Sequence, residues 1–370
     1  MRVYQLSLCV VLLLAALLPA SASADLDLIR SADLKNELCD AKAQQVNSPL
    51  SGVDFISDNE VLIYTVCREG VALSRRDRFQ ATDPNHLKTV VLDLATGAVK
   101  QRFDWPTHGH ESSVSVTHAG DLLVRRDNLL QLLSPDGEPF ARLRIRKEGP
   151  NNSMLLALSP AVDAMAVAVS FSAPDGHMFS GIGILDSRSL HLLTRWEEYA
   201  ELWSIAASPL AAARTAGAGP QLDVRDFKSV NWKTIARSSD RSIFHPLFVS
   251  NSEFAVPAEN TVELFDISGN SRGLFGCPHA VKAAVSRDGR ILAAMCVPDS
   301  VGAPSILPEF GAQFGMVTFQ IYALSPQELL GSVNEPMSPA FRYDFALSPS
   351  GSRLAVVDNL KVSVYEVPSP

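Results

Sequence analysis

The sequence predicts an all-β protein, namely a seven-bladed β-propeller of four-stranded antiparallel blades whose ring is closed by an N-terminal strand. Three observations support this fold class. A strand that ends in a turn similar to Ser-Pro-x-Gly recurs seven times, as expected of a propeller. A second and a third strand follow most copies, and a fourth strand follows six of them, which is the make-up of a blade. The last copy lacks its fourth strand because the chain ends at Pro370.

The repeat is clearest at Phe345 to Val367, where an apolar run ends in Ser-Pro-Ser-Gly and the runs RLAVVD and KVSVYEV follow. These three runs predict a three-stranded meander. The seven copies of the first strand begin at Val53, Val114, Leu156, Ile205, Leu247, Ala283 and Phe345.

Third strands tend to end in a hydrophobic residue and an acid. Aspartates occupy this place in four units: Asp93, Asp186, Asp226 and Asp266. At such turns a carboxylate accepts backbone hydrogen bonds. Because the four copies are equivalent within the repeat, we expect them to maintain the fold rather than to catalyse a reaction.

The N-terminus has the pattern of a secretory signal: Arg2, an apolar run from Leu6 to Leu18, and small residues ending at Ala24. The run is too short for a membrane-spanning helix. We therefore expect an exported protein, periplasmic or extracellular, with no membrane anchor. The predicted parts are a signal peptide (1–24), an N-terminal arm that contributes the closing strand (25–51) and the seven-bladed propeller (52–370).

The arm allows two interpretations. Its leucines at positions 34 and 38 have helical spacing. A propeller must also close its ring, because an open edge of unpaired backbone groups invites aggregation. We therefore expect Asp33 to Cys39, or its neighbours, to supply the missing strand of the last blade.

Four cysteines follow the predicted signal, and the repeat pairs them. Cys67 and Cys296 fall at the same position of the second strand when the first and sixth repeats are superposed. Cys277 ends a fourth strand just before the sixth repeat, and Cys39 stands in the corresponding place before the first. Of the three possible pairings, we predict the disulfides Cys39–Cys67 and Cys277–Cys296, since export favours oxidation. The alternative is four buried free thiols.

The composition is that of an exported globular protein, with 46% hydrophobic and 19% charged residues and a net charge of -8. Nucleic-acid binding requires a clustered basic face, so we expect no nucleic-acid partner. Catalytic elbows, phosphate-binding loops and paired-cysteine zinc patterns are absent from the sequence. We therefore predict no catalytic residue, metal or cofactor, and we expect a monomer.

Three connections between second and third strands are long: 68–87, 172–180 and 298–315. In a propeller they emerge on one face, together with the links between blades, and long loops on a rigid scaffold usually carry binding residues. The last loop is apolar and forms either a contact patch or a small core of its own. The candidate contact residues are Arg75, Arg76, Arg78, His108, His110, Ile306, Leu307, Phe310 and Phe314.

His108 and His110 lie on one side of an extended link between the first two blades. A zinc site would need a third converging ligand. The nearest histidine, His118, follows the next strand and is expected on the opposite face of the blade. These histidines are therefore predicted not to share a metal ion.

The segments FALSPSGSRLAV and AVSRDGRILAAM, and the strand VSVYEV, resemble the divergent WD40 and YVTN-type β-propellers of exported bacterial proteins over nearly the whole mature chain. The Trp-Asp of WD40 blades is replaced by Tyr365-Glu366 or Phe265-Asp266, and the Gly-His pair is missing. The resemblance implies a scaffold that binds other molecules. It carries over no catalytic residue, because propellers host many unrelated activities.

Two function classes follow. One is a non-catalytic binding protein, with a protein or small ligand bound on the long-loop face. The alternative is a lactonase-like hydrolase or lyase, which would gather acids or histidines from several blades around the axis. The first strands, which line the axis, are instead mostly apolar and small: Ala157, Ala206, Ala207, Ala283, Ala284 and Ala346. The binding class is therefore favoured.

Overall fold

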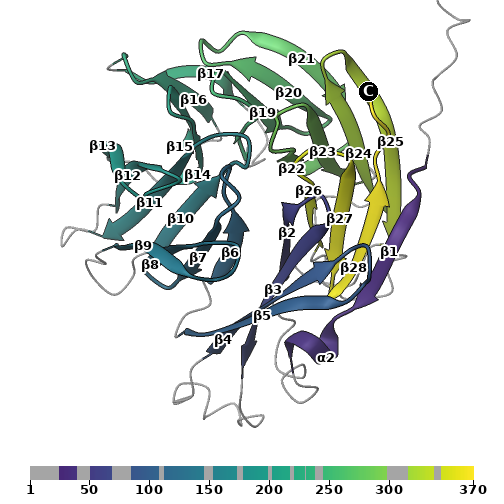
Figure 1. The fold of residues 1–370 in the computed structure, drawn as a ribbon. Helices are drawn as coiled ribbons and strands as arrows, with labels where there is room; N and C mark the ends of the chain where they lie inside the picture. The colour runs from purple at the N-terminus through teal and green to yellow at the C-terminus, as the bar shows by residue number, and fades with distance from the viewer. Residues whose placement is uncertain are drawn as a thin grey trace, which may run out of the picture.

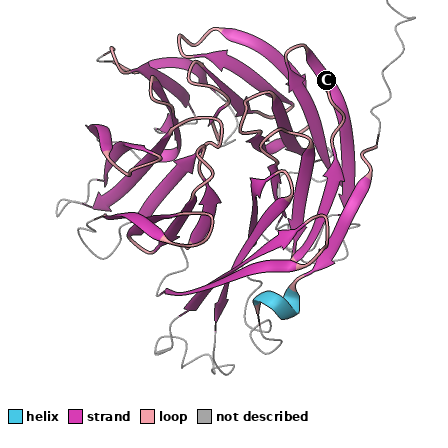
Figure 2. Ribbon diagram, in the orientation of Figure 1, coloured by secondary structure: helices cyan, strands magenta, loops and turns pink. Residues whose placement is uncertain are grey.

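A computed structural model shows a ring of seven antiparallel sheets of four strands each, arranged around a central axis (Figure 1). Nearly all of the regular structure is strand, and the described part of the chain holds one short helix, α2 (Lys35–Leu38) (Figure 2). The structure describes residues 25–39, 51–68, 85–107, 112–145, 153–172, 178–198, 202–216, 221–229, 231–237, 245–297, 316–336 and 343–370.

Each blade is a meander that runs outward from the axis. Blade 1 consists of β2 (Ser51–Ser57), β3 (Glu60–Arg68), β4 (Asn85–Asp93) and β5 (Val99–Thr107). Blade 2 consists of β6 (Ser113–Val116), β7 (Leu122–Arg126), β8 (Leu129–Leu133) and β9 (Pro139–Arg144). Blade 3 consists of β10 (Ser153–Leu158), β11 (Ala164–Ser172), β12 (Met178–Asp186) and β13 (Leu192–Glu198). Blade 4 consists of β14 (Leu202–Ala207), β15 (Ala211–Ala216), β16 (Gln221–Asp226) and β17 (Lys233–Arg237). Blade 5 consists of β18 (Leu247–Phe248), β19 (Glu253–Pro257), β20 (Thr261–Asp266) and β21 (Ser271–Gly276). Blade 6 is β22 (Ala280–Val285), β23 (Ile291–Cys296), β24 (Met316–Leu324), β25 (Gln327–Pro336), and blade 7 is β26 (Tyr343–Leu347), β27 (Arg353–Asp358), β28 (Lys361–Glu366), β1 (Leu28–Asp33).

The ring is closed by the N-terminal strand, as predicted. β1 pairs antiparallel with β28, so the first and last described strands lie side by side at the outer edge of blade 7 (Figure 1). The closing strand precedes the segment that the sequence favoured. Asp33 is its last residue, and the leucines at helical spacing that follow it flank and end α2. The arm thus contains both a closing strand and a short helix, one after the other.

The arm crosses three blades. The backbone of Leu26 donates to Ser332 in blade 6 (3.1 Å), and β1 then pairs with blade 7. The Arg30 guanidinium donates to the carbonyl of Leu94 in blade 1 (2.8 Å). Leu38 is buried in the core between blades 7 and 1. The arm therefore fastens the two ends of the ring to each other.

Both predicted cysteine pairs lie at disulfide distance. The Cα atoms of Cys39 and Cys67 are 5.8 Å apart, and those of Cys277 and Cys296 are 5.3 Å apart. Both distances suit a disulfide. Each bridge joins the segment that follows an outermost strand to the second strand of the next blade, so the two bridges are equivalent in the repeat.

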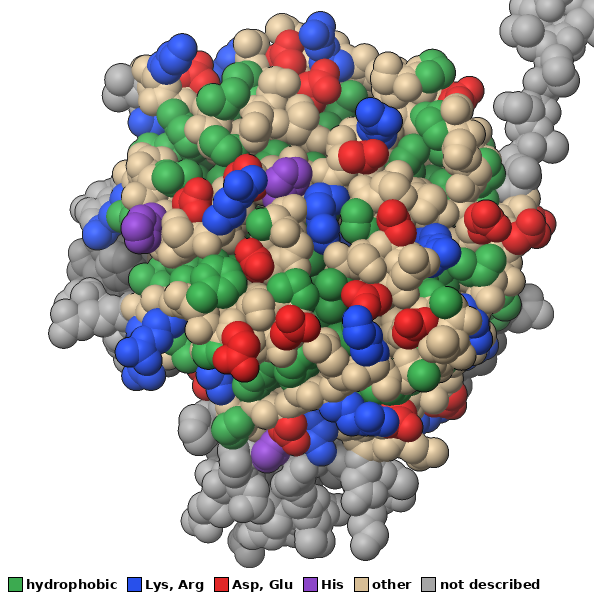
Figure 3. Space-filling view, viewed as in Figure 1, with side chains coloured by type: hydrophobic (Ala, Val, Ile, Leu, Met, Phe, Trp, Pro, Cys, Tyr) green, Lys and Arg blue, Asp and Glu red, His purple; other side chains and the backbone are tan. Residues whose placement is uncertain are grey.

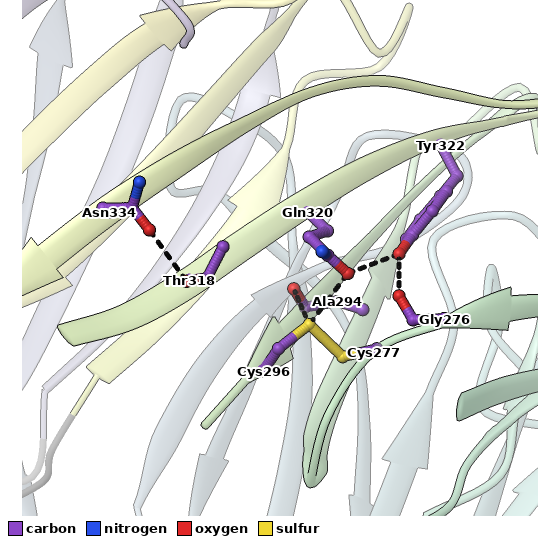
Figure 4. Close-up of a disulfide and its surroundings, with 8 residues drawn as sticks. All are labelled: Gly276, Cys277, Ala294, Cys296, Thr318, Gln320, Tyr322 and Asn334. Carbon is purple, nitrogen blue, oxygen red and sulfur yellow. Dashed lines mark hydrogen bonds between the residues drawn. A yellow bond between two sulfur atoms is a disulfide. The ribbon is translucent and has the colours of Figure 1, made fainter. Parts of the chain in front are cut away.

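The Cys277–Cys296 bridge is surrounded by polar groups of blade 6 (Figure 4). The amide oxygen of Gln320 lies 3.3 Å from the sulfur of Cys296. The hydroxyl of Tyr322 donates to the backbone carbonyl of Gly276, at 2.5 Å. Burial raises the pKa of Tyr322 to about 12, so this hydroxyl stays a donor. These contacts reinforce the junction between blades 5 and 6.

The described residues form seven hydrophobic core clusters, one between each pair of neighbouring blades. The cluster between blades 6 and 7, for example, packs Phe319 against Phe345, with ring centroids 5.2 Å apart. Each sheet thus buries both faces, as the near-continuous apolar second strands require. ILAAMC in β23 is buried at every position.

The aspartates at the ends of the third strands have the structural role predicted for them. Backbone N–H groups of Thr96, Arg188, Lys228 and Ser268 donate to Asp93, Asp186, Asp226 and Asp266, respectively, at 2.8 to 3.0 Å. The backbone N–H of Thr96 is the main cause of a lowered pKa at Asp93. These carboxylates cap turns and are not gathered at one place.

Candidate functional site

The loop residues predicted as contacts lie outside the described residues. These are Arg75, Arg76, Arg78, His108, His110, Ile306, Leu307, Phe310 and Phe314. His118 is described, in the turn between β6 and β7, and its Nδ1 lies 2.8 Å from the carbonyl oxygen of Pro160 in blade 3. That turn belongs to the face opposite the long loops, as expected.

Titratable residues that the sequence analysis missed lie on the innermost strands or just before them. Three occupy the same position in the repeat, four residues before the residue that opens the first turn: His245, which precedes β18, Lys282 of β22 and Asp344 of β26. The alanines predicted at the axis do lie on innermost strands, and Ala206, Ala207 and Ala346 are buried. The inner ring is therefore only partly apolar.

Lys282 and Asp344 form an ion pair between neighbouring blades. The other carboxylate oxygen of Asp344 accepts the backbone N–H of Val53 in blade 1, at 2.9 Å. The Lys282 ammonium also lies 5.5 Å from the centre of the Phe345 ring, within cation–π range. Burial, aided by the charge of Lys282, lowers the pKa of His245. His245 is therefore neutral around pH 7.

Asp54 continues this series from blade 1 to blade 2. Its carboxylate accepts the backbone N–H of Val116 at 2.7 Å and that of Phe55 at 2.8 Å. The carboxylate is enclosed by inner strands, although the residue as a whole is only partly buried. Burial, with a smaller contribution from the charge of Asp344, raises the pKa of Asp54 to about 6.

Two second-strand residues, Tyr64 and Arg125, pair with small first-strand residues. Tyr64 lies over Gly52, where a Cβ would meet the phenol ring at 2.3 Å. Burial and the charges of two nearby carboxylates raise the pKa of Tyr64. Arg125 pairs with Ser113 and donates to the carbonyl of Met154 in blade 3 (2.7 Å).

These residues form one structure, which we name the polar arc. It runs through blades 5, 6, 7, 1 and 2, and its links connect neighbouring innermost strands. Its members are His245, Lys282, Asp344, Tyr64, Asp54 and Arg125. Blades 3 and 4 complete the ring with Leu155 and Ser204 at the equivalent position.

Arg287 connects three blades at the opposite end of the axis. It lies in the turn of blade 6, and its guanidinium donates to the carbonyls of Phe55 and Ile56 in blade 1 (3.2 and 3.3 Å). A Cβ at Gly120 of blade 2 would lie 3.3 Å from the same guanidinium. The turns of non-neighbouring blades are thus in contact around Arg287.

The arc is built from compensated charges. Each of its two carboxylates accepts at least one backbone N–H, and its ammonium group is paired. Among the residues that the structure describes, no group of three or more His, Cys, Asp or Glu could hold a metal ion. The face of the molecule in Figure 3 likewise shows acidic and basic side chains intermixed with apolar ones. The described site therefore suits hydrogen bonding better than charge-driven binding.

Solved structures match the fold over almost the whole chain. A chain of the mitotic checkpoint complex has a TM-score of 0.56 and 13% identity, covering 95% of each chain. The WD40 domain of Toxoplasma gondii coronin has a TM-score of 0.55 and 11% identity, covering 94% of this chain and 89% of that one. The fold is that of a WD40-type β-propeller. The Neurospora crassa Pan2 WD40 domain also matches, with a TM-score of 0.53 and 12% identity, over 94% of this chain and 97% of that one.

Sequence comparison adds no closer relationship. A scan against models of protein families finds no match, and a search of curated proteins finds none. At 11 to 13% identity the structural matches establish the WD40-type fold alone. No helix in the described part of the chain has the length and apolar character needed to cross a membrane.

Proposed function

We propose that the protein is an exported, non-catalytic binding protein whose partner, a protein or small ligand, binds the long-loop face. The observation that carries this proposal is a complete WD40-type ring whose inner charged groups are engaged in holding blades together. One neighbouring structure belongs to a multi-protein assembly, the mitotic checkpoint complex. Rigid scaffolds of this kind usually bind through their loops.

Export is supported by two independent features. The first 24 residues have the pattern of a signal peptide. Both cysteine pairs lie at disulfide distance, and stable disulfides are typical of oxidising compartments. The bacterial, YVTN-like character suggested by the repeat belongs to the same proposal, and so does a monomeric state.

The test is a pull-down from a cell-envelope extract with the mature protein as bait, beside a variant that lacks residues 298 to 315. A Leu210→Ala variant is the control, because Leu210 is exposed in a turn of the opposite face. We expect the deletion to lose a partner that wild type and the control retain. Equal recovery on all three baits would contradict the assignment of the face. Thermal unfolding of the deletion variant establishes that the ring remains intact.

The raised pKa of Asp54, about 6, favours a second candidate, a hydrolase or lyase acting at the axis. Groups with such a pKa can act as general acids or bases near neutral pH. This candidate predicts turnover of lactones or esters that Asp54→Asn abolishes. Absence of turnover across a panel of such substrates would exclude it and leave the binding function in place.

A further inference from the structure

The outermost strand of blade 2 has an exposed face whose charges are not balanced. Phe140, Arg142 and Arg144 of β9 are exposed. Ala141 and Leu143, which alternate with them, pack against the core between blades 2 and 3. Among the described residues, the three exposed side chains have no partner in a hydrogen bond, an ion pair or a ring contact. The outer wall of blade 2 therefore presents an aromatic ring and two uncompensated positive charges.

Basic side chains on other outermost strands are engaged with the ring instead. In β5 of blade 1, Lys100 forms an ion pair with Glu60. In β17 of blade 4, the Lys233 ammonium donates to the backbone carbonyl of Ser268 in blade 5, at 2.6 Å. These cations hold strands and blades together, whereas the two arginines of β9 have no such role within the described structure. In a protein of net charge -8, they are available to a partner.

β9 also presents an unpaired edge. It is the outer strand of its four-stranded sheet, so among the described residues no strand pairs with its outer side (Figure 1). A β-bulge leaves Phe140 as an extra residue, and the fourth strand of every other blade has a bulge too, so this bulge belongs to the fold. From Ala141 to Arg144 the pairing with β8 is regular. Such an edge is a template for a further strand.

The arginines select the chemistry of the strand that this edge accepts. Side chains on adjacent antiparallel strands lie opposite each other, where opposite charges attract and like charges repel. A second copy pairing through the same edge would bring the arginines of both copies together, so self-association is disfavoured. An acidic strand neutralises them, and the charges that protect the edge from other strands thus become a source of specificity.

We propose that β9 docks an extended acidic segment of a partner protein, which adds to blade 2 as a further strand. Two carboxylates of this segment lie opposite Arg142 and Arg144, and an apolar side chain contacts Phe140. Main-chain hydrogen bonds supply the affinity, and the alternate side chains supply the specificity. The surface is on the outer wall of the ring, so this inference goes beyond the proposed binding at the long-loop face and does not depend on it. Because β9 has six residues, the interface is small and the complex transient.

The test measures binding of a short fluorescein-labelled peptide, in which glutamate and valine alternate, to the mature protein by fluorescence polarisation. The double variant Arg142→Ala/Arg144→Ala should weaken binding by roughly two- to thirtyfold, the combined effect of two cross-strand charge pairs. Added salt should weaken binding to the wild type, because it screens exposed charges. Arg237→Ala, at an exposed arginine of the outermost strand β17, is the matched control and should change nothing.

A second peptide separates strand pairing from attraction between charges. It has the same sequence, but alternate backbone amides are N-methylated, so that one edge cannot donate hydrogen bonds. We expect it to bind much more weakly than its parent. Equal binding of the two peptides would overturn the added strand, and equal binding of the parent peptide to wild type and to the double variant would overturn the site.

Two further outcomes complete the test. The proposal is overturned if the acidic peptide fails to bind the wild type at millimolar concentration in low salt. It is also overturned if the protein sediments with vesicles of phosphatidylglycerol and phosphatidylcholine while the peptide does not bind, because the surface would then suit a lipid headgroup. The variant lacking residues 298 to 315 should bind the peptide as wild type does, and loss of binding there would assign the peptide to the long-loop face instead. Thermal unfolding of the double variant establishes that its ring is intact.

Discussion

At the residue scale, Asp54 shows how the ring places a carboxylate in an unfavourable setting. Two backbone N–H groups stabilise its charge, yet enclosure by inner strands outweighs them and raises its pKa to about 6 from 3.8. The folded state therefore binds a proton more tightly than the unfolded state. The contribution of Asp54 to stability falls as pH rises from about 4 to about 6, by at most about 3 kcal/mol.

Asp54→Asn is therefore expected to flatten the pH dependence of the unfolding free energy between about pH 4 and 6. Asp93→Asn is the control, because the pKa of Asp93 is shifted in the opposite direction. The lowered pKa of Asp93 stabilises the fold above its unfolded pKa, and that stability is lost as pH falls. Urea unfolding from about pH 2.5 to pH 7.5 covers both transitions. Identical pH profiles for wild type and Asp54→Asn would show that the carboxylate is not perturbed.

Gly289 is fixed by conformation and by a neighbouring blade. Its φ is +71°, and a Cβ there would lie 2.4 Å from the carbonyl oxygen of Val249 in blade 5. We expect Gly289→Ala to lower the unfolding free energy by about 2 kcal/mol or more, because an alanine adds left-handed strain and a backbone clash. Gly181→Ala, with nothing within 4 Å, should be neutral or stabilising. Denaturant unfolding of the two variants makes the comparison, and equal stabilities would contradict it.

At the element scale, strands were predictable where a turn and an apolar alternation coincide, as in RLAVVD of β27. The closing strand was harder to place. The LIRSAD sequence of β1 forms an outer edge and is half exposed, so its alternation is weak. The polar arc could not be predicted strand by strand, because Lys282 and Asp344 are single charges in separate elements. An alignment of the seven repeats would have placed both residues at the same repeat position as His245.

The arm should owe its stability to Leu38 more than to the exposed residues of β1. Leu38 is 2% exposed in the core between blades 7 and 1, whereas Leu28 is 56% exposed. We expect Leu38→Ala to cost about 2–5 kcal/mol of unfolding free energy and Leu28→Ala about 0.5 kcal/mol or less. Urea denaturation at neutral pH measures the unfolding free energies of the two variants. A small loss for Leu38→Ala would mean that the arm is not part of the cooperative fold.

At the scale of the whole molecule, the ring is a closed series of seven interfaces, and its two cysteine pairs lie at two of them. Cys39–Cys67 spans the interface between blades 7 and 1, where the chain ends meet, and Cys277–Cys296 spans the interface between blades 5 and 6. Superposition of the repeats predicted both pairs because each blade meets the next in the same way. The long-loop face lacked such repetition, since its loops differ in length and composition.

Removing either bridge should weaken the ring independently of the other. We expect each double Cys→Ser variant, at positions 39 and 67 or 277 and 296, to lose about 2–4 kcal/mol of unfolding free energy. Because the bridges lie at separate interfaces, the quadruple variant should lose the sum to within about 0.5 kcal/mol. Denaturant unfolding with and without reductant measures this, and thiol titration of the unfolded mature protein, which lacks Cys9, should find no free thiol. Four titratable thiols would establish that the cysteines are reduced and that the ring holds by packing alone.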